Sequence, residues 1–158
     1  MIGFTNILHP TDFSEASQYA GERAVDFAKQ CGAKLTVLHA YASPAALEGG
    51  FVLPDPVPEL EAAIDRVADD PHVEVERVLR VGTPAETIVE FAERHHCDLI
   101  VMGTHGRTGL GHLLMGSTAE KVIRTARCPV MVVSPRAAEP VEPLEPHVTK
   151  TKKAVTIV

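Results

Sequence analysis

The stretch 98–127 constrains the fold more strongly than any other part of the sequence. It begins with an apolar run at 99–102, which is too short for an ordinary helix and is closed by Gly103. Such a run is typical of a strand that is buried on both faces of a parallel sheet. After a glycine-rich loop, apolar residues recur with helical spacing over 119–126. This order of strand, loop and helix predicts an α/β protein.

Two short patterns mark expected helix starts. Ser117 and Glu120 form a capping box, in which a hydroxyl and a carboxylate each satisfy a free backbone N–H group. Thr83 and Glu86 repeat the pattern, with Pro84 at the first helical position. We therefore expect one helix to begin at each place.

The loop between Gly103 and Ala119 has the composition of a phosphate-binding site. Glycines allow the backbone to bend and to approach a ligand closely, and the N–H groups of a helix N-terminus attract anions. The loop contains no Asp or Glu but does contain His105, Arg107 and His112, in a chain of net charge −6. The segment is therefore either a phosphate-binding loop or a glycine-rich turn with structural duties alone.

The spacing Gly103-x2-Gly106-x9-Gly116-Ser117 resembles the nucleotide-binding branch of the universal stress protein family, and the resemblance covers residues 1–134. It implies ATP as the ligand, Mg²⁺ bound mainly through the phosphates, and no catalytic residue or protein metal ligand. A Walker A loop fits less well, because Ser117 stands where its lysine belongs. The residues that the resemblance places at the nucleotide are Pro10, Thr11, Asp12, Ala40, Met102, Gly103, Gly106, Arg107, Gly109, Gly116, Ser117, Thr118 and Val130.

One carboxylate follows the first expected strand, at 3–9. Asp12 comes just after that strand, and Ser14 then caps a helix that Gly32 closes. On the residues alone, Asp12 either assists the helix start or contacts a ligand. The resemblance implies that Asp12 accepts from the ribose hydroxyls. It further implies a main-chain contact with adenine from Ala40, and phosphate donors in Arg107, Ser117 and Thr118.

The other expected elements complete an open five-stranded parallel sheet with helices on both faces. Strands are expected at 35–40, 73–81 (an edge strand) and 129–134, and a helix at 59–69 after a loop at 41–58. His9 and His39 are expected to be hydrogen-bonded core residues. The resemblance implies a Rossmann-like fold of the adenine nucleotide α-hydrolase type, with strand order 3-2-1-4-5. This order reverses between strands one and four, which places Asp12 opposite the glycine loop.

Composition bounds the cellular setting. The acidic balance argues against nucleic acid or an anionic membrane as the main partner. With no signal peptide and no apolar span of membrane-crossing length, we expect a cytoplasmic protein. Cys31, Cys97 and Cys128 are odd in number and widely spaced, which favours reduced thiols at element ends. The apolar strand at 130–133 would leave an open sheet edge, and the resemblance implies a homodimer paired through it.

These observations predict an ATP-binding, nucleotide-dependent stress-response or regulatory module. Two alternatives stay open: a weak ATP hydrolase, and an interaction module that binds cyclic AMP or no nucleotide. Beyond the domain at 1–134, residues 135–158 form a Pro- and Glu-rich spacer and then a strand-like run at 155–158. We expect that run to add a strand to a sheet edge.

Overall fold

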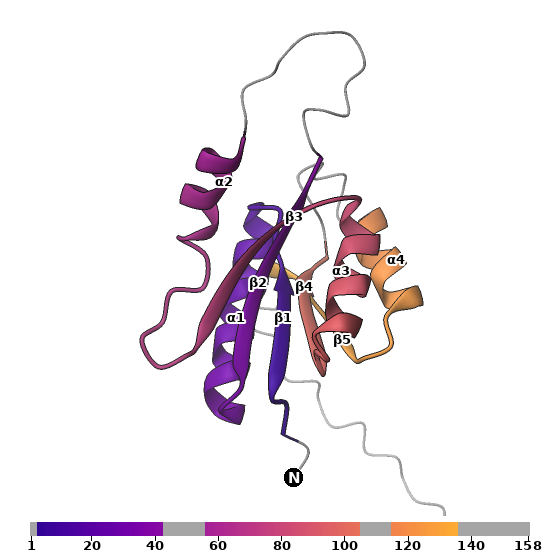
Figure 1. The fold of residues 1–158 in the computed structure, drawn as a ribbon. Coiled ribbons are helices and arrows are strands. Elements are labelled where there is room, and N and C mark those ends of the chain that lie inside the picture. The colour runs from indigo at the N-terminus through magenta and orange to yellow at the C-terminus, as the bar shows by residue number, and fades with distance from the viewer. Residues whose placement is uncertain (1–2, 43–55, 105–114, 136–158) are drawn as a thin grey trace, which may run out of the picture.

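The computed structural model describes residues 3–42, 56–104 and 115–135 (Figure 1). No helix in these ranges has the length and apolar character needed to cross a membrane. The tail strand expected at 155–158 lies outside them. The elements, in chain order, are β1 (Asn6–Pro10), α1 (Glu15–Cys31), β2 (Lys34–Tyr41), α2 (Val57–Ile64), β3 (Val75–Val81), α3 (Pro84–Arg94), β4 (Leu99–Gly103), α4 (Ser117–Thr125) and β5 (Val130–Val133).

The strands form one parallel sheet in the order β3-β2-β1-β4-β5, which confirms the predicted fold class and places β3 at an edge. β1 lies at the centre, where Ile7 pairs with Leu35 on one side and with Leu99 on the other. The chain therefore changes direction across the sheet between β1 and β4. The carboxyl ends of these two strands flank the predicted ligand site.

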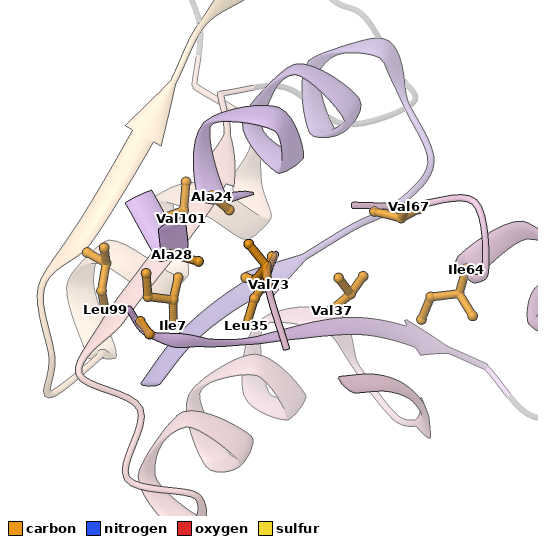
Figure 2. Packing of buried hydrophobic residues seen from close by; sticks show 11 residues of the cluster. Ile7, Ala24, Ala28, Leu35, Val37, Ile64, Val67, Val73, Leu99 and Val101 are labelled. Carbon is orange, nitrogen blue, oxygen red and sulfur yellow. The ribbon is translucent and has the colours of Figure 1, made fainter. Parts of the chain in front are cut away.

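Both faces of the sheet are buried, as the continuous apolar runs predicted. Ile7 and Leu8 point to opposite faces and both are 0% exposed. One cluster joins β1, β2 and β4 to α1 and to the α2–β3 segment (Figure 2), and the other joins the opposite face to α3 and α4. Each fully buried aliphatic side chain contributes about 1.5–3 kcal/mol, so the two clusters hold the helices on the sheet.

Helix α1 begins and ends where predicted and packs closely against the sheet. The Ser14 side chain accepts from the N–H of Ser17, and Gly32 ends the helix in a left-handed conformation. A Cβ built on Gly103 would lie 2.8 Å from the carbonyl oxygen of Ala16. A Cβ on Gly21 would lie 3.0 Å from Nε2 of His9. Two glycines, one on each side of the contact, thus let α1 approach β1 and β4.

Neither predicted capping box is present. Thr83 occupies the N-cap of α3 but makes no side-chain capping bond. At α4 the N-cap is Gly116, so Ser117 is already the first helical residue and cannot cap. Glycine is tolerated at the N-cap without supplying an acceptor. On the same helix, Ile123 belongs to the apolar spacing of 119–126 but is 42% exposed, and the buried positions of α4 are Ala119 and Val122.

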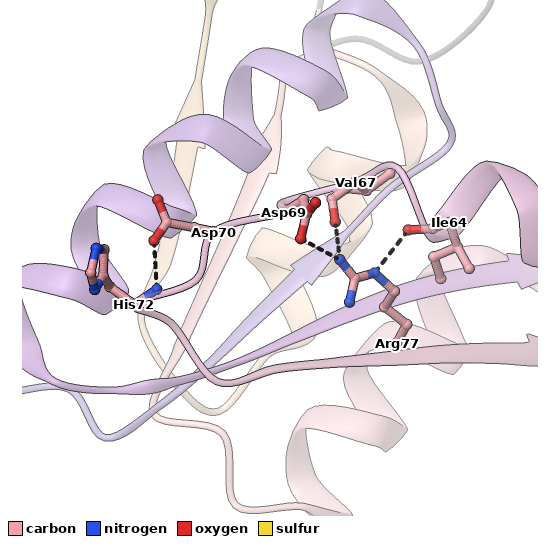
Figure 3. Close-up of polar contacts among 6 residues, drawn as sticks. All are labelled: Ile64, Val67, Asp69, Asp70, His72 and Arg77. Carbon is pink, nitrogen blue, oxygen red and sulfur yellow. Dashed lines mark hydrogen bonds and ion pairs between the residues drawn. The ribbon is translucent and has the colours of Figure 1, made fainter.

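The second helix is shorter than the predicted 59–69. It ends at Ile64, and Ala68 adopts a positive φ of 55° that a continuing helix does not allow. The Arg77 side chain donates to the carbonyl oxygens of Ile64 and Val67, at 3.2 Å each (Figure 3). Strand β3 thereby supplies donors to two carbonyl groups at and just beyond the end of the helix, where the Ile64 carbonyl also accepts from the N–H of Val67.

Strand boundaries moved by a few residues. β1 begins at Asn6 rather than Gly3, and the Asp98 carboxylate accepts the N–H groups of Thr5 and Asn6 at this end of the strand. β3 begins at Val75 rather than Val73.

The three cysteines are unpaired. Cys97 is buried, and its burial raises the pKa of the thiol to about 11, so it stays protonated at neutral pH.

Candidate functional site

A cavity of about 300 Å³ opens at the carboxyl ends of β1, β2 and β4. This volume is at the lower end of the range for small-molecule sites. It is bounded by the ends of three neighbouring strands, by the first turns of α3 and α4, and by one residue of α1. Its lining residues are Pro10, Thr11, Asp12, Ser17, Leu38, Ala40, Pro84, Ile88, Met102, Gly103, Thr104, Gly116, Ser117, Thr118 and Ala119.

Most residues that the sequence proposed for the site meet at this cavity. Asp12 with the two residues before it, Ala40, and the described residues of the glycine motif all line it. Gly106, Arg107 and Gly109 lie outside the described residues. Val130 is not in the described lining, because it pairs with Ile100, away from the carboxyl end of β4, and packs in the core on the α3–α4 face.

The carboxylate wall is a tight turn between β1 and α1. The Thr11 N–H donates to the carbonyl oxygen of Leu38 at 2.9 Å, which continues the β1–β2 pairing for one more residue. Oδ1 of Asp12 accepts from the N–H of Ser14 at 3.0 Å. Between them Phe13 has a positive φ of 64°. Asp12 therefore supports the helix start while it lines the cavity, and the two functions proposed from the sequence are compatible.

The opposite wall is the base of the glycine loop. Thr104 donates its N–H to Val133 at 3.1 Å, and Gly116 donates its N–H to the carbonyl oxygen of Thr104 at 2.8 Å. These bonds hold the two ends of the loop together beside β4 and β5. Because α4 begins directly at the cavity with a glycine N-cap, no side chain of the described residues caps the helix start at Ser117 and Thr118. The first turn of α4 is therefore arranged to receive an anion.

The third wall combines apolar side chains with one segment of main chain. The pairing of β1 with β2 ends at Pro10 and Leu38. In parallel strands, residues two apart direct their N–H and C=O groups toward the same neighbour. Because Leu38 accepts from Thr11 on the β1 side, Ala40 faces the same side, past the end of β1. Its N–H and C=O groups are thus placed to donate to and accept from a ligand in the cavity.

Among the described residues, sequence reasoning missed six that line the cavity: Ser17, Leu38, Pro84, Ile88, Thr104 and Ala119. Leu38, Ile88 and Ala119 also belong to the core, and a core position carries no separate sequence signal for a ligand. Ser17 offered one signal, since it is a hydroxyl on the α1 face that otherwise holds Ala20, Ala24 and Ala28.

Two histidines next to the cavity are core residues, as expected. His9 is fully buried, and its Nδ1 lies 2.9 Å from the carbonyl oxygen of Val101, so Nδ1 carries the proton. Burial lowers the pKa of the His9 imidazole below its usual value. Nδ1 of His39 lies 2.8 Å from the carbonyl oxygen of Thr11, and its ring packs on Phe13. The His39 ring therefore supports the carboxylate wall, whereas the His9 ring links β1 to β4.

Comparisons with known proteins agree with this geometry. The family model described as the universal stress protein family matches residues 3–134. Universal stress protein MJ0531 of Methanocaldococcus jannaschii is 37% identical over 139 residues, 82% of each chain. The structure of UspA from Lactobacillus plantarum superposes with a TM-score of 0.67 at 28% identity, covering 84% of this chain and 99% of that one. A universal stress protein in complex with cAMP superposes with a TM-score of 0.63 at 29% identity, covering 83% and 97%. The chain belongs to the universal stress protein family.

Proposed function

We propose that this protein binds ATP in the cavity between Asp12 and the first turn of α4, and acts as a nucleotide-dependent regulatory module of the stress response. The observation that carries the proposal is one cavity with a carboxylate on one wall and an uncapped helix N-terminus on the other. A nucleotide fits these two walls, because its ribose hydroxyls can donate to the carboxylate and its phosphates are anions that suit the helix N-terminus.

The main chain of Ala40 supports adenine as the base. A C=O beside an N–H can accept from the exocyclic amino group of adenine and donate to the adjacent ring nitrogen. Guanine presents an oxygen and an N–H at the same positions, which would leave both groups of Ala40 facing like partners. Leaving buried groups unpaired costs about 1–3 kcal/mol each, so ATP should bind at least tenfold more tightly than GTP.

The phosphates would lie along Gly103, Gly116 and the first turn of α4. In this proposal Ser117 and Thr118 donate to them together with Arg107, while Gly106 and Gly109 leave room for their approach. The residues fit a Mg-nucleotide, since Mg²⁺ commonly keeps several waters and is bound mainly through phosphate oxygens. The ion would offset the phosphate charge, and this chain would contribute position and hydrogen bonds.

Assembly and location complete the proposal. β5 is an edge strand of four half-buried residues, and an open edge of this kind is suited to pairing with a second copy. We therefore include a homodimer through residues 130–133. Unpaired cysteines suit a reducing compartment, which supports the cytoplasm as the location.

Mass spectrometry of ligand released from freshly purified, heat-denatured protein tests the proposal, followed by competition between ATP, GTP and cyclic AMP for the empty protein. We expect adenine nucleotide in the released fraction and preference for ATP. Preference for cyclic AMP would favour the ligand named in the similar structure. Steady hydrolysis near 10 per second, the typical enzyme rate, would favour the hydrolase if an Asp12 variant abolished it.

A further inference from the structure

The turn that carries Asp12 is held by a chain of buried hydroxyl groups. The N–H of Phe13 donates to Oγ1 of Thr11 at 3.1 Å, and this Oγ1 lies 3.0 Å from Oγ of Ser17. The Ser17 hydroxyl in turn lies 3.0 Å from the carbonyl oxygen of Ser14, as its donor. Thr11 and Ser17 are only 6% and 4% exposed. These contacts join both ends of the turn to the first turn of α1.

The direction of this chain is determined by its last member. A carbonyl oxygen can only accept, so the Ser17 proton points to Ser14. Thr11 must therefore donate its own proton to Ser17 while it accepts from Phe13. The hydroxyl protons of Thr11 and Ser17 each have one acceptor, so the hydrogen bonds of this chain can run in only one direction. Fully satisfied buried networks of this kind make a local structure rigid.

This rigid network holds the backbone of Phe13 in a strained conformation. Phe13 has a φ of 64°, and this left-handed region costs a residue with a side chain about 1–2 kcal/mol. Asp12 is the residue between Thr11 and Phe13, so the orientation of its carboxylate depends on this strained step. Strained residues persist where their surroundings hold them, and here the surroundings are the hydroxyl chain and the contact of Phe13 with His39.

We propose that Thr11 and Ser17 are positioning residues that hold the Asp12 carboxylate in the orientation in which it receives the ribose hydroxyls. The proposal rests on the ATP-binding function proposed above and adds the residues that set the geometry of its ribose contact. Ser17 thereby has a function at the site through Asp12 rather than through a bond of its own to the nucleotide.

The test compares ATP with 2′,3′-dideoxy-ATP, which lacks both ribose hydroxyls, on the full chain. Ser17→Ala and the nearly isosteric Thr11→Val break the hydroxyl chain, whereas Thr11→Ser keeps it. We expect the two breaking variants to bind ATP about three- to tenfold more weakly, as the loss of one buried hydrogen bond implies. Their affinity for dideoxy-ATP should fall by a clearly smaller factor than their affinity for ATP, and Thr11→Ser should keep more of the ATP affinity than Thr11→Val.

A double variant adds a second readout. In an Asp12→Ala background, Ser17→Ala should cause no further loss of ATP affinity, because the group that it positions is gone. Equal weakening for ATP and dideoxy-ATP, or an undiminished effect in the Asp12→Ala background, would overturn the positioning function while ATP binding itself stands. Absence of ATP binding by the unmodified protein would instead overturn the proposed function. If Ser17→Ala fails to fold, the Thr11→Val and Thr11→Ser pair decides the question.

Discussion

Replacing Gly103 by alanine should destabilise the ligand-free protein, because α1 packs against the position that a side chain of residue 103 would occupy. A Cβ at this position would lie 2.8 Å from the carbonyl oxygen of Ala16 and 3.1 Å from the nitrogen of Ser17. Both are backbone atoms of α1, which cannot rotate away as a side chain can. The helix or the strand must therefore shift at the point where both support the cavity.

The magnitude follows from two opposing effects. Forcing an extra methyl group into a packed contact costs about 1–3 kcal/mol, and a backbone neighbour favours the upper half of that range. Alanine recovers about 0.5–1 kcal/mol because glycine loses more conformational freedom on folding. The net loss should be about 1–2.5 kcal/mol. For a chain of this length, each kcal/mol lowers Tm by about 2–4 °C, so we expect a fall of about 2–10 °C.

The assay is thermal and urea denaturation without nucleotide. Gly3→Ala is the matched control, because a Cβ there meets nothing within 4 Å. The control should melt within about 2 °C of the unmodified protein, the range of surface substitutions of up to about 0.5 kcal/mol. If Gly103→Ala melts like the control, then close helix packing is not what requires this glycine, and the reasoning is wrong.

Three further predictions concern His9, Arg77 and the β5 edge. Since burial lowers the pKa of His9 in the folded state, the unfolded chain binds more protons than the folded protein below about pH 6.5, the pKa of an exposed histidine. The free energy of unfolding should therefore fall as the pH drops below about 6.5, by at most about 1.4 kcal/mol per pH unit. His9→Asn should reduce the difference between the urea midpoints at pH 7.5 and 5.5. Arg77→Met keeps the aliphatic stem but removes the charged donors to Ile64 and Val67, so it should cost about 1.5–3 kcal/mol by urea denaturation, and an unchanged midpoint would refute the capping function. Because the Val133 carbonyl oxygen accepts from Thr104, the adjacent Val132 directs its N–H away from β4, toward the open edge. Sedimentation velocity should show a dimer that Val132→Pro converts to monomer. A monomeric unmodified protein at micromolar concentration would contradict pairing through β5.

The sheet was predictable from sequence because its signals are local and redundant. Each buried strand is a short apolar run, and helix α1 has both a capping serine and a left-handed glycine at its ends. The position of Asp12 opposite Gly103 followed from strand order, which the family resemblance supplied, and from the location of both residues at strand ends. These features needed no knowledge of side-chain contacts.

What the sequence could not supply depends on packing between distant segments. Arg77, which donates to the carbonyl oxygen at the end of α2, lies thirteen residues beyond Ile64. The capping box predicted at Ser117 failed because the same S/T-x-x-E pattern occurs whether the hydroxyl residue is the N-cap or the first helical residue. Thr83 does occupy the N-cap, but its side chain makes no capping bond. Likewise Gly103 was assigned to phosphate access alone, and its contact with α1 became visible only when the two segments were placed together.

The most direct test of ATP binding is a calorimetric titration of the ligand-free protein with Mg-ATP, alongside Asp12→Ala. We expect saturable binding with one nucleotide per chain, and about 2.7 kcal/mol of added stability at a hundredfold excess over Kd. Asp12→Ala should weaken binding by about 1–3 kcal/mol through loss of the charged acceptor, and without ligand it should melt somewhat below the unmodified protein, because the N–H of Ser14 loses its acceptor. If millimolar Mg-ATP gives neither binding heat nor a thermal shift, the protein is not an ATP-binding member of its family.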